Sequence, residues 1–206
     1  DLVTENKLTS SDLIQPIFLK ENLKGQELIE SMPDIYRYDD ECALKEIENI
    51  INSGINTIAV FPIIDPSKKD KAGKEAVNKN NYISNSIKKI KNNFPEITII
   101  ADIALDPYTD HGHDGIVINQ EVENDETIKI LSDQSLLLAQ AGADILAPSD
   151  MMDGRIGLIR NTLEKEGFKN TIIMSYAAKY NSKFYGPFRD AIQSSSNLGN
   201  ASKASY

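Results

Sequence analysis

Short apolar runs recur along the chain at roughly even intervals, and most of them are rich in isoleucine, valine or threonine. Runs of this length and composition are typical of strands that are buried on both faces, as in a parallel sheet. Five such runs predict five strands, at residues 13–19, 57–64, 97–103, 144–148 and 171–176.

Between the predicted strands, apolar residues recur with the spacing of amphipathic helices. Three stripes of this kind are Leu44, Ile47, Ile50 and Ile51; Ile128, Leu131, Ser135, Leu138 and Ala139; and Ile156, Ile159 and Leu163. Each stripe is followed by a glycine, namely Gly54, Gly142 or Gly167. Glycine is the residue that most often follows the last turn of a helix, so the stripes predict three helices with defined ends.

The starts of the second and third helices are marked by short polar side chains that can cap a helix. We expect Asn124 or Asp125 to cap the second helix, and Asp153 or Asp150 to cap the third. The repeating order of strand, helix, glycine and strand predicts an α/β fold with a parallel sheet. This order leaves a doubly wound sheet and a barrel equally open.

The composition limits the class of protein. A chain of 206 residues with 40% hydrophobic content can bury one sizeable core, so we expect a single domain without a membrane span. The net charge of -9 argues against a nucleic-acid surface, because phosphate binding needs clustered Lys and Arg. Cys42 is the single cysteine, which excludes a disulfide within the chain, and we interpret it as structural. Residues 1–6 have neither a basic nor an apolar leader pattern, and we interpret the start as a cut end.

Candidate chemistry follows the last predicted strand. Lys179 comes just after this strand, where a β/α fold places its reactive groups, and Arg189 follows ten residues later after Gly186 and Pro187. An amine that is partly desolvated, or close to another cation, can attack a ketone to form a Schiff base. A guanidinium can hold a carboxylate through two parallel hydrogen bonds. The pair therefore indicates a covalent amine beside a carboxylate-binding group.

Four motifs follow one another along the chain: Ser31-Met32-Pro33; residues 102–115, which read Asp-Ile-Ala-Leu-Asp-Pro-Tyr through His-Gly-His-Asp-Gly; residues 147–155, which read Ala-Pro-Ser-Asp-Met-Met-Asp-Gly-Arg; and the segment from Lys179 to Arg189. Together they resemble the porphobilinogen synthase family, also called 5-aminolevulinate dehydratase, over about residues 13–206. The resemblance implies a lyase that condenses two molecules of 5-aminolevulinate to porphobilinogen, the pyrrole precursor of haem.

The resemblance also favours the barrel over the doubly wound sheet. It implies a partial (β/α)8 TIM barrel, of which this chain holds about the first five strand–helix units, since a complete barrel typically has about 250 residues. We expect residues 1–206 to form a single incomplete barrel domain, with residues 1–12 as the remnant of an N-terminal arm and residues 190–206 as the active-site lid. The family forms octamers, or hexamers in some members, so we expect a homo-oligomer. We expect a cytoplasmic location, or a plastid if a transit peptide has been lost.

The resemblance assigns roles to particular residues. Lys179 corresponds to one of the two lysines that form Schiff bases with substrate, and Asp102 corresponds to a catalytic residue facing the substrate. Arg189 and Lys203 correspond to cations that hold the substrate carboxylate, and we expect Tyr185 to line the same site. The second lysine belongs to a Val-Lys-Pro segment that does not occur in this sequence, so we expect the chain to be inactive alone.

The metal expected from the resemblance is not zinc. Many family members hold a catalytic zinc through three cysteines, at positions that are Ala104, Asp106 and Asp114 here. Carboxylate oxygens favour harder ions such as Mg²⁺ or K⁺. The chain therefore resembles the zinc-independent, aspartate-rich branch, in which Mg²⁺ acts at an allosteric site outside this sequence. Asp106 and Asp114 are the metal candidates, and His111 with His113 offer the alternative of an open zinc site.

Two other functions fit the same pattern of elements. A class I aldolase also forms a Schiff base on a barrel lysine, and a non-catalytic domain could assemble with other chains through an acidic surface and an open sheet edge. The motifs between Asp102 and Arg189 favour the synthase over both alternatives.

Overall fold

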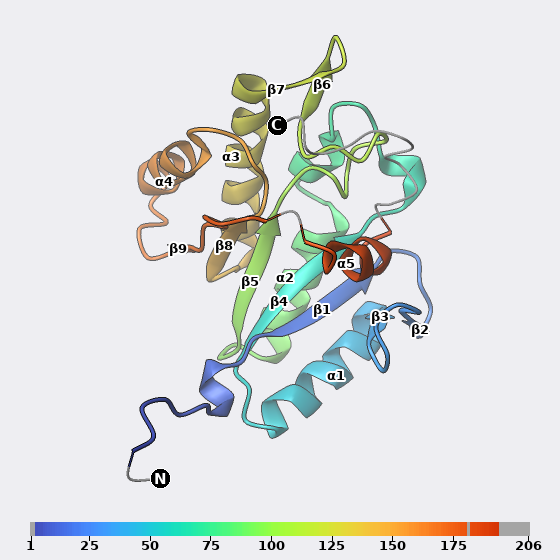
Figure 1. Ribbon diagram of the computed structural model, residues 1–206, viewed down its shortest axis with the longest axis vertical. Coiled ribbons are helices and arrows are strands. Elements are labelled where there is room, and N and C mark those ends of the chain that lie inside the picture. The colour runs from blue at the N-terminus through green and yellow to red at the C-terminus, as the bar shows by residue number, and fades with distance from the viewer. Residues whose placement is uncertain (1–2, 181, 194–206) are drawn as a thin grey trace.

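The computed structural model describes residues 3–180 and 182–193, in which strands and helices alternate around one large sheet (Figure 1). The large sheet contains β1 (Gln15–Lys20), β2 (Gln26–Leu28), β3 (Tyr36–Tyr38), β4 (Thr57–Ile63), β5 (Thr98–Ile103), β8 (Ile145–Pro148) and β9 (Ile172–Ile173). A separate hairpin pairs β6 (Ile116–Ile118) with β7 (Glu121–Glu123). The helices are α1 (Asp40–Asn52), α2 (Tyr82–Asn93), α3 (Asn124–Ala141), α4 (Arg155–Lys165) and α5 (Tyr185–Ala191), and short 3-10 turns occupy Ser10–Asp12, Pro66–Lys68 and Lys74–Val77.

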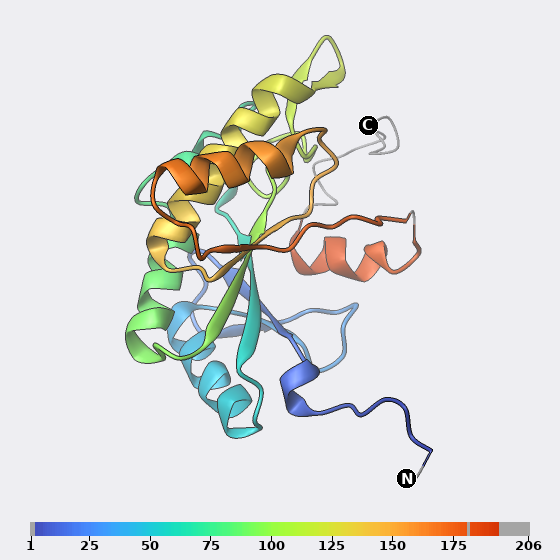
Figure 2. The same ribbon diagram turned by 90° about the vertical axis from the view of Figure 1, so that its left-hand side faces the viewer.

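The parallel strands lie side by side in the same order as they occur in the sequence. The sheet order is β2-β3-β1-β4-β5-β8-β9, and β1, β4, β5, β8 and β9 run parallel to one another. Helices α1 to α4 cover one face of this sheet (Figure 2). A doubly wound sheet would reverse its strand order and carry helices on both faces. The described residues therefore form part of a (β/α)8 barrel, and the predicted α/β fold with a partial TIM barrel is confirmed.

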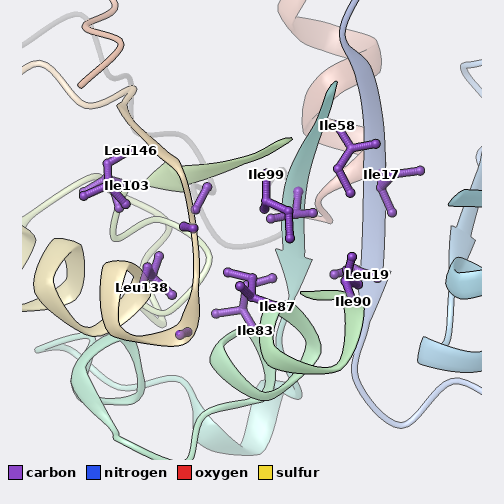
Figure 3. Close-up of a cluster of buried hydrophobic side chains, with 14 of the residues drawn as sticks. Ile17, Leu19, Ile58, Ile83, Ile87, Ile90, Ile99, Ile103, Leu138 and Leu146 are labelled. Carbon is purple, nitrogen blue, oxygen red and sulfur yellow. The ribbon is translucent and has the colours of Figure 1, made fainter. Parts of the chain in front are cut away.

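The main hydrophobic core fills the space between the sheet and helices α1 to α4 (Figure 3). Ile17 and Leu19 of β1 lie in this core together with Ile83 and Ile87 of α2. Phe18, between the two β1 residues, belongs to a second cluster on the opposite face of the sheet. This alternation with period two follows from strand geometry, which points successive side chains to opposite faces.

The second cluster lies under α5, which packs on the face that α1 to α4 leave uncovered (Figure 2). The ring of Phe188 meets that of Phe61 edge-on at 5.2 Å between centroids and lies 6.3 Å from that of Phe18. Ala191 and Ile192 are buried in the same cluster. A helix of seven residues is too short to be stable alone, so this burial, about 1.5–3 kcal/mol for a large apolar side chain, is what holds it.

The observed strand boundaries differ from the predicted ones in the first and the last of the five predicted strands. Leu13 and Ile14 precede β1 and are exposed. β9 covers only two residues of the predicted run 171–176, but Met174 N still donates to Leu146 O at 2.8 Å and Tyr176 N donates to Pro148 O at 3.3 Å. The predicted run therefore lies extended along β8 even where it is not a regular strand.

The expected cap of α3 is wrong by one residue. The N-cap is Glu123, whose carboxylate accepts a hydrogen bond from Glu126 N at 2.7 Å, whereas Asn124 and Asp125 lie in the first turn. The reason is that β7 runs directly into α3, so the last residue of the strand must also begin the helix. Among the described residues, no helix is long and apolar enough to cross a membrane.

The expected cap of α4 is also wrong. The N-cap is Gly154, which has φ of 78° and makes no side-chain capping bond. Asp153 is exposed at this point, and Asp150 is fully buried. The Asp150 carboxylate instead accepts a hydrogen bond from Met152 N at 2.8 Å, so it stabilises the turn before the helix. By contrast, Gly54, Gly142 and Gly167 follow their helices with positive φ, as predicted.

Candidate active site

Asp102 lies on the inner face of the partial barrel. Ile99, Ala101 and Ile103 of β5 face the main core, and the alternation of the strand places Asp102 on the opposite face. Its Oδ1 atom is buried and has no hydrogen-bond donor among the described residues. Burial raises the pKa of Asp102 to about 7, against the lowering effects of the Ser149 hydroxyl and the Lys179 cation. A carboxyl group with this pKa can both donate and accept a proton near neutral pH.

The acidic neighbours of Asp102 act in the same direction as burial. The charges of Asp106 and Asp114 both raise the pKa of Asp102, because a second negative charge nearby disfavours ionisation. Asp102 of β5 and the loop after β5 therefore carry carboxyl groups whose ionisation a nearby cation would favour.

Lys179 lies in the extended segment that follows β9 and reaches across the end of β8. Its Nζ atom donates a hydrogen bond to the backbone oxygen of Ser149 and lies 5.9 Å from the centre of the Tyr185 ring. The charge of Lys179 also lowers the pKa of both Asp102 and Asp150. The structure thus brings together three predicted site residues, Lys179, Asp102 and Tyr185.

Asp150 is held in a structural role. Burial raises its pKa, and the N–H of Met152 and the guanidinium of Arg155 oppose the rise. The Nε atom of Arg155 lies 3.0 Å from Asp150 Oδ2, and both side chains are largely removed from solvent. A buried ion pair of this kind fixes the turn between β8 and α4, and this turn also carries Ser149, the partner of Lys179.

Tyr176 is a site residue that the sequence did not single out. It lies three residues before Lys179, and burial together with the charge of Asp102 raises the pKa of its hydroxyl to about 12, although 43% of its surface stays exposed. Tyr185 adds a smaller effect in the same direction. A signal existed in the sequence, since a tyrosine just after an apolar strand stands where β/α folds place functional side chains.

Arg189 lies one turn after Tyr185 in α5 and is half-buried. Within residues 3–180 and 182–193 it has no hydrogen bond or ion pair, so its guanidinium is available to a ligand. The adjacent Asp190 pairs with Arg37 and not with Arg189. Lys203, the second predicted carboxylate ligand, lies outside the described residues.

The loop after β5 holds the predicted metal ligands. Asp106 and Asp114 are buried, and each already has an interaction within the protein. His113 N donates to His111 Nδ1 at 3.2 Å, and the two imidazole rings lie 5.6 Å apart. In the described part of the chain, no group of three or more His, Cys, Asp and Glu side chains is arranged to hold a metal ion.

The lysine-rich run at residues 68–71 lies against the loop after β5. Lys69 is half-buried, and burial lowers its pKa while the charge of Asp106 opposes this. The backbone of Asp70 pairs with the loop after β5 through Asp70 N to Tyr108 O at 3.2 Å. The segment after β4 therefore supports the loop that carries Asp106.

Comparison with known proteins identifies the family. The model of the family described as "Delta-aminolevulinic acid dehydratase" matches residues 1–206. The chain belongs to this family. It is 49% identical over 197 residues to the delta-aminolevulinic acid dehydratase of Bradyrhizobium diazoefficiens, covering 96% of the chain and 56% of that protein. It is 49% identical over 194 residues to the enzyme of Chlamydia pneumoniae, covering 94% of the chain and 58% of that protein.

A solved structure agrees with this assignment. The delta-aminolevulinic acid dehydratase (porphobilinogen synthase) of Toxoplasma gondii, solved in complex with its reaction product porphobilinogen, superposes with a TM-score of 0.96 at 41% sequence identity. The match covers all of this chain and 58% of that one. The resemblance drawn from the four motifs is thereby confirmed, and neither the aldolase nor the non-catalytic alternative is favoured.

Proposed function

We propose that this protein acts as a porphobilinogen synthase, a lyase that condenses two molecules of 5-aminolevulinate, and that Lys179 forms the Schiff base with one of them. The observation that carries the proposal is the position of the Lys179 amine beside Asp102, a carboxyl group with a pKa of about 7. Membership of a family whose named members are dehydratases of this kind supports the same reaction.

The proposed chemistry begins at the amine. Deprotonated Lys179 Nζ adds to the ketone carbon of 5-aminolevulinate, and the carbonyl oxygen becomes the hydroxyl of a carbinolamine. Asp102, protonated in part near pH 7, donates a proton to that hydroxyl, which leaves as water while the nitrogen lone pair forms the C=N bond. The resulting carboxylate of Asp102 stays close to the cationic imine and stabilises it.

The substrate carboxylate is the second point of attachment. Arg189 has the planar donor geometry that suits a carboxylate, and it lies on the same short helix as Tyr185, which contacts Lys179. We assign Arg189 to the substrate carboxylate, with Lys203 as the further cation and Tyr185 as part of the wall. When Arg189 binds the carboxylate at one end of the substrate, the ketone carbon is held next to Lys179 Nζ.

The test is borohydride trapping on the product of the complete gene. Reduction in the presence of 5-aminolevulinate should attach substrate to Lys179, as found by peptide mapping. Lys179→Arg, which keeps the charge but has no nucleophilic amine, should remove that adduct and the synthesis of porphobilinogen. Lys183→Arg is the matched control, since Lys183 is an exposed lysine four residues further along. Adducts in the unmodified protein that are confined to lysines other than Lys179 would overturn the assignment.

We also propose that the whole protein depends on magnesium or potassium and not on zinc. The support is the donor set, because Ala104 offers no ligand and Asp106 and Asp114 offer oxygen atoms. No step of the proposed reaction passes through a metal ion.

Metal removal tests this. Activity should survive dialysis against a strong zinc chelator and respond to added Mg²⁺ or K⁺. If stoichiometric zinc alone restored activity, the oxygen-ligand proposal would be wrong, and His111 or His113 would become the expected ligand.

Assembly and location are proposals of the same kind. Homo-oligomers of eight or six copies in the cytoplasm agree with the family, and the bacterial relatives named above agree with the location. Analytical ultracentrifugation and cell fractionation of the complete protein are the direct measurements.

A further inference from the structure

Arg37 of β3 is a buried charge whose partners come from a distant part of the chain. It is 4% exposed, and its guanidinium points its donors at the end of α5, more than 150 residues later. Nε donates to Ala191 O at 2.8 Å, and Nη2 donates to Asp190 O and lies 3.3 Å from Asp190 Oδ1. Buried charges persist in proteins only when they are well paired, so this arrangement calls for a role.

The remaining donor of Arg37 completes the network. Nη1 donates to Glu27 Oε1 at 2.7 Å, and Glu27 also accepts a hydrogen bond from Lys20 at 2.6 Å. Both interactions lower the pKa of Glu27, with the Lys20 hydrogen bond as the largest cause. Every group of donors on the Arg37 guanidinium is therefore occupied by the protein. Because the side chain is only 4% exposed, its effect on a substrate must be exerted through α5.

The last turn of α5 is the part that Arg37 holds. The final carbonyl groups of a helix have no partner within the helix and carry partial negative charge, which a buried guanidinium satisfies well. Ser31 adds hydrogen bonds from its backbone N–H and its hydroxyl to Asp190 Oδ2. These bonds, with that of Arg37, lower the pKa of Asp190.

Arg189 lies between the two anchored residues of this turn. Phe188, before it, packs against Phe18 and Phe61, and Asp190, after it, is held by Arg37 and Ser31. The backbone of Arg189 is thus fixed on both sides while its own guanidinium makes no bond within the described residues. The fixed backbone therefore restricts where the Arg189 guanidinium can lie, while its N–H groups stay available to a ligand.

We propose that Arg37 is a positioning residue for substrate binding: by holding the C-terminal carbonyl groups of α5, it sets the place of the Arg189 guanidinium relative to Lys179. The inference rests on the proposed function, because it takes Arg189 as the ligand of the substrate carboxylate. It concerns a residue that touches neither substrate nor the reacting atoms.

The central experiment compares Arg37→Met, Arg37→Lys and Arg160→Met in the product of the complete gene. Arg160 is the matched control, because it also donates to two backbone oxygens, Thr171 O at 2.7 Å and Phe168 O at 2.8 Å. These oxygens precede β9, whereas Lys179 follows it. Arg37→Met should raise KM for 5-aminolevulinate about tenfold or more, since a displaced Arg189 loses a charge-assisted hydrogen bond to the substrate carboxylate. Borohydride trapping at Lys179 under saturating substrate should persist. Arg37→Lys should be intermediate, because a single ammonium cannot reach all four acceptor atoms.

Hydrogen exchange supplies a readout that does not need activity. Amides at the end of α5, among them Ile192 N, which donates to Phe188 O at 3.1 Å, should exchange faster in Arg37→Met and stay unchanged in Arg160→Met. An unchanged KM, an unchanged exchange rate, or an equal rise in KM for Arg160→Met would each overturn the proposal.

Two further comparisons keep the outcome decisive. If Arg37→Met does not fold, Ser31→Ala removes the hydrogen bond from the hydroxyl of an exposed residue to Asp190 Oδ2, and it should loosen α5 and raise KM in the same direction. Absence of any Lys179 adduct in the unmodified protein would count against the proposed function alone, since the exchange of α5 tests the contact with Arg37 separately.

Discussion

At the scale of single residues, the pKa of Asp102 at the candidate site is raised chiefly by burial. The ordinary pKa of an aspartate is about 3.9, and in the folded protein it rises to about 7. Between these two values the folded protein binds more protons than the unfolded chain. The contribution of Asp102 to the free energy of unfolding therefore falls as the pH rises from about 4 to about 7. Above the pKa of the folded protein, this contribution no longer changes with pH.

Asp102→Asn should remove this dependence. The variant should gain stability relative to the unmodified protein as the pH rises from about 4 to about 7, with a constant difference above pH 8. Porphobilinogen synthesis should be lost at every pH, because an amide cannot donate the required proton. Thermal unfolding at a series of pH values measures the first effect, and Asp110→Asn, an exposed change in the following loop, is the control. If the stability of Asp102→Asn and that of the unmodified protein changed with pH in parallel, the pKa of Asp102 would not be raised.

Arg189→Lys should weaken substrate binding although the charge is kept, because the planar fork of donors is lost. The loss of one charge-assisted hydrogen bond costs about 1.5–3 kcal/mol. That cost corresponds to a rise in KM of about ten- to a hundredfold. Steady-state kinetics on the complete protein measures it, with Lys183→Arg as a change of similar size on the same segment. An unmoved KM would exclude Arg189 as the carboxylate ligand.

Residues of the site differ in how far their roles could be predicted from sequence. Lys179 and Asp102 follow or end apolar strands, which made them candidates, and the family resemblance then assigned their roles. Arg37 could not be selected, because its partners Asp190 and Ala191 are distant in the sequence and nothing local marks the pairing. Burial of a charge is a property of the folded molecule, and only the structure shows it.

At the scale of elements, the start of α3 offers a direct test of capping. Glu123→Ala should cost about 0.5–2 kcal/mol in the free energy of unfolding, because Glu126 N loses its acceptor. Asp125→Ala is the control and should cost only a few tenths of a kcal/mol, through the charge at the helix start. Denaturant unfolding of both variants decides the matter. A larger loss for Asp125→Ala would move the cap back to the residue that the sequence suggested.

The elements that escaped prediction have weak local signals for physical reasons. Ile83, Ile87 and Ile90 of α2 have helical spacing, but the lysine and asparagine residues around them resemble a solvated loop. The hairpin of β6 and β7 turns through Asn119 and Gln120, both with positive φ. A turn of that kind is usually recognised from a glycine at the second position, which is absent here.

At the scale of the whole molecule, the sheet has β8 as the only described neighbour of β9. Ile172 on this strand is 57% exposed, and a parallel edge of this kind readily pairs with another chain. The chain of 206 residues on its own should therefore self-associate, and Ile172→Lys should reduce the association. Ile118→Lys, at a similarly exposed isoleucine of the hairpin, is the control. Sedimentation velocity measures the difference, and equal association of both variants would exclude this edge as the contact.

The order of the strands also has a consequence for how the molecule is made. Each of β4, β5, β8 and β9 pairs with the parallel strand that precedes it, so every strand can add to the sheet as it leaves the ribosome. The contact between Arg37 and Ala191 is different, since it closes a loop of 154 residues and bears the entropy of that closure. The helix that carries Arg189 is therefore the last described element to reach its place during synthesis, after all the described strands of the large sheet have paired.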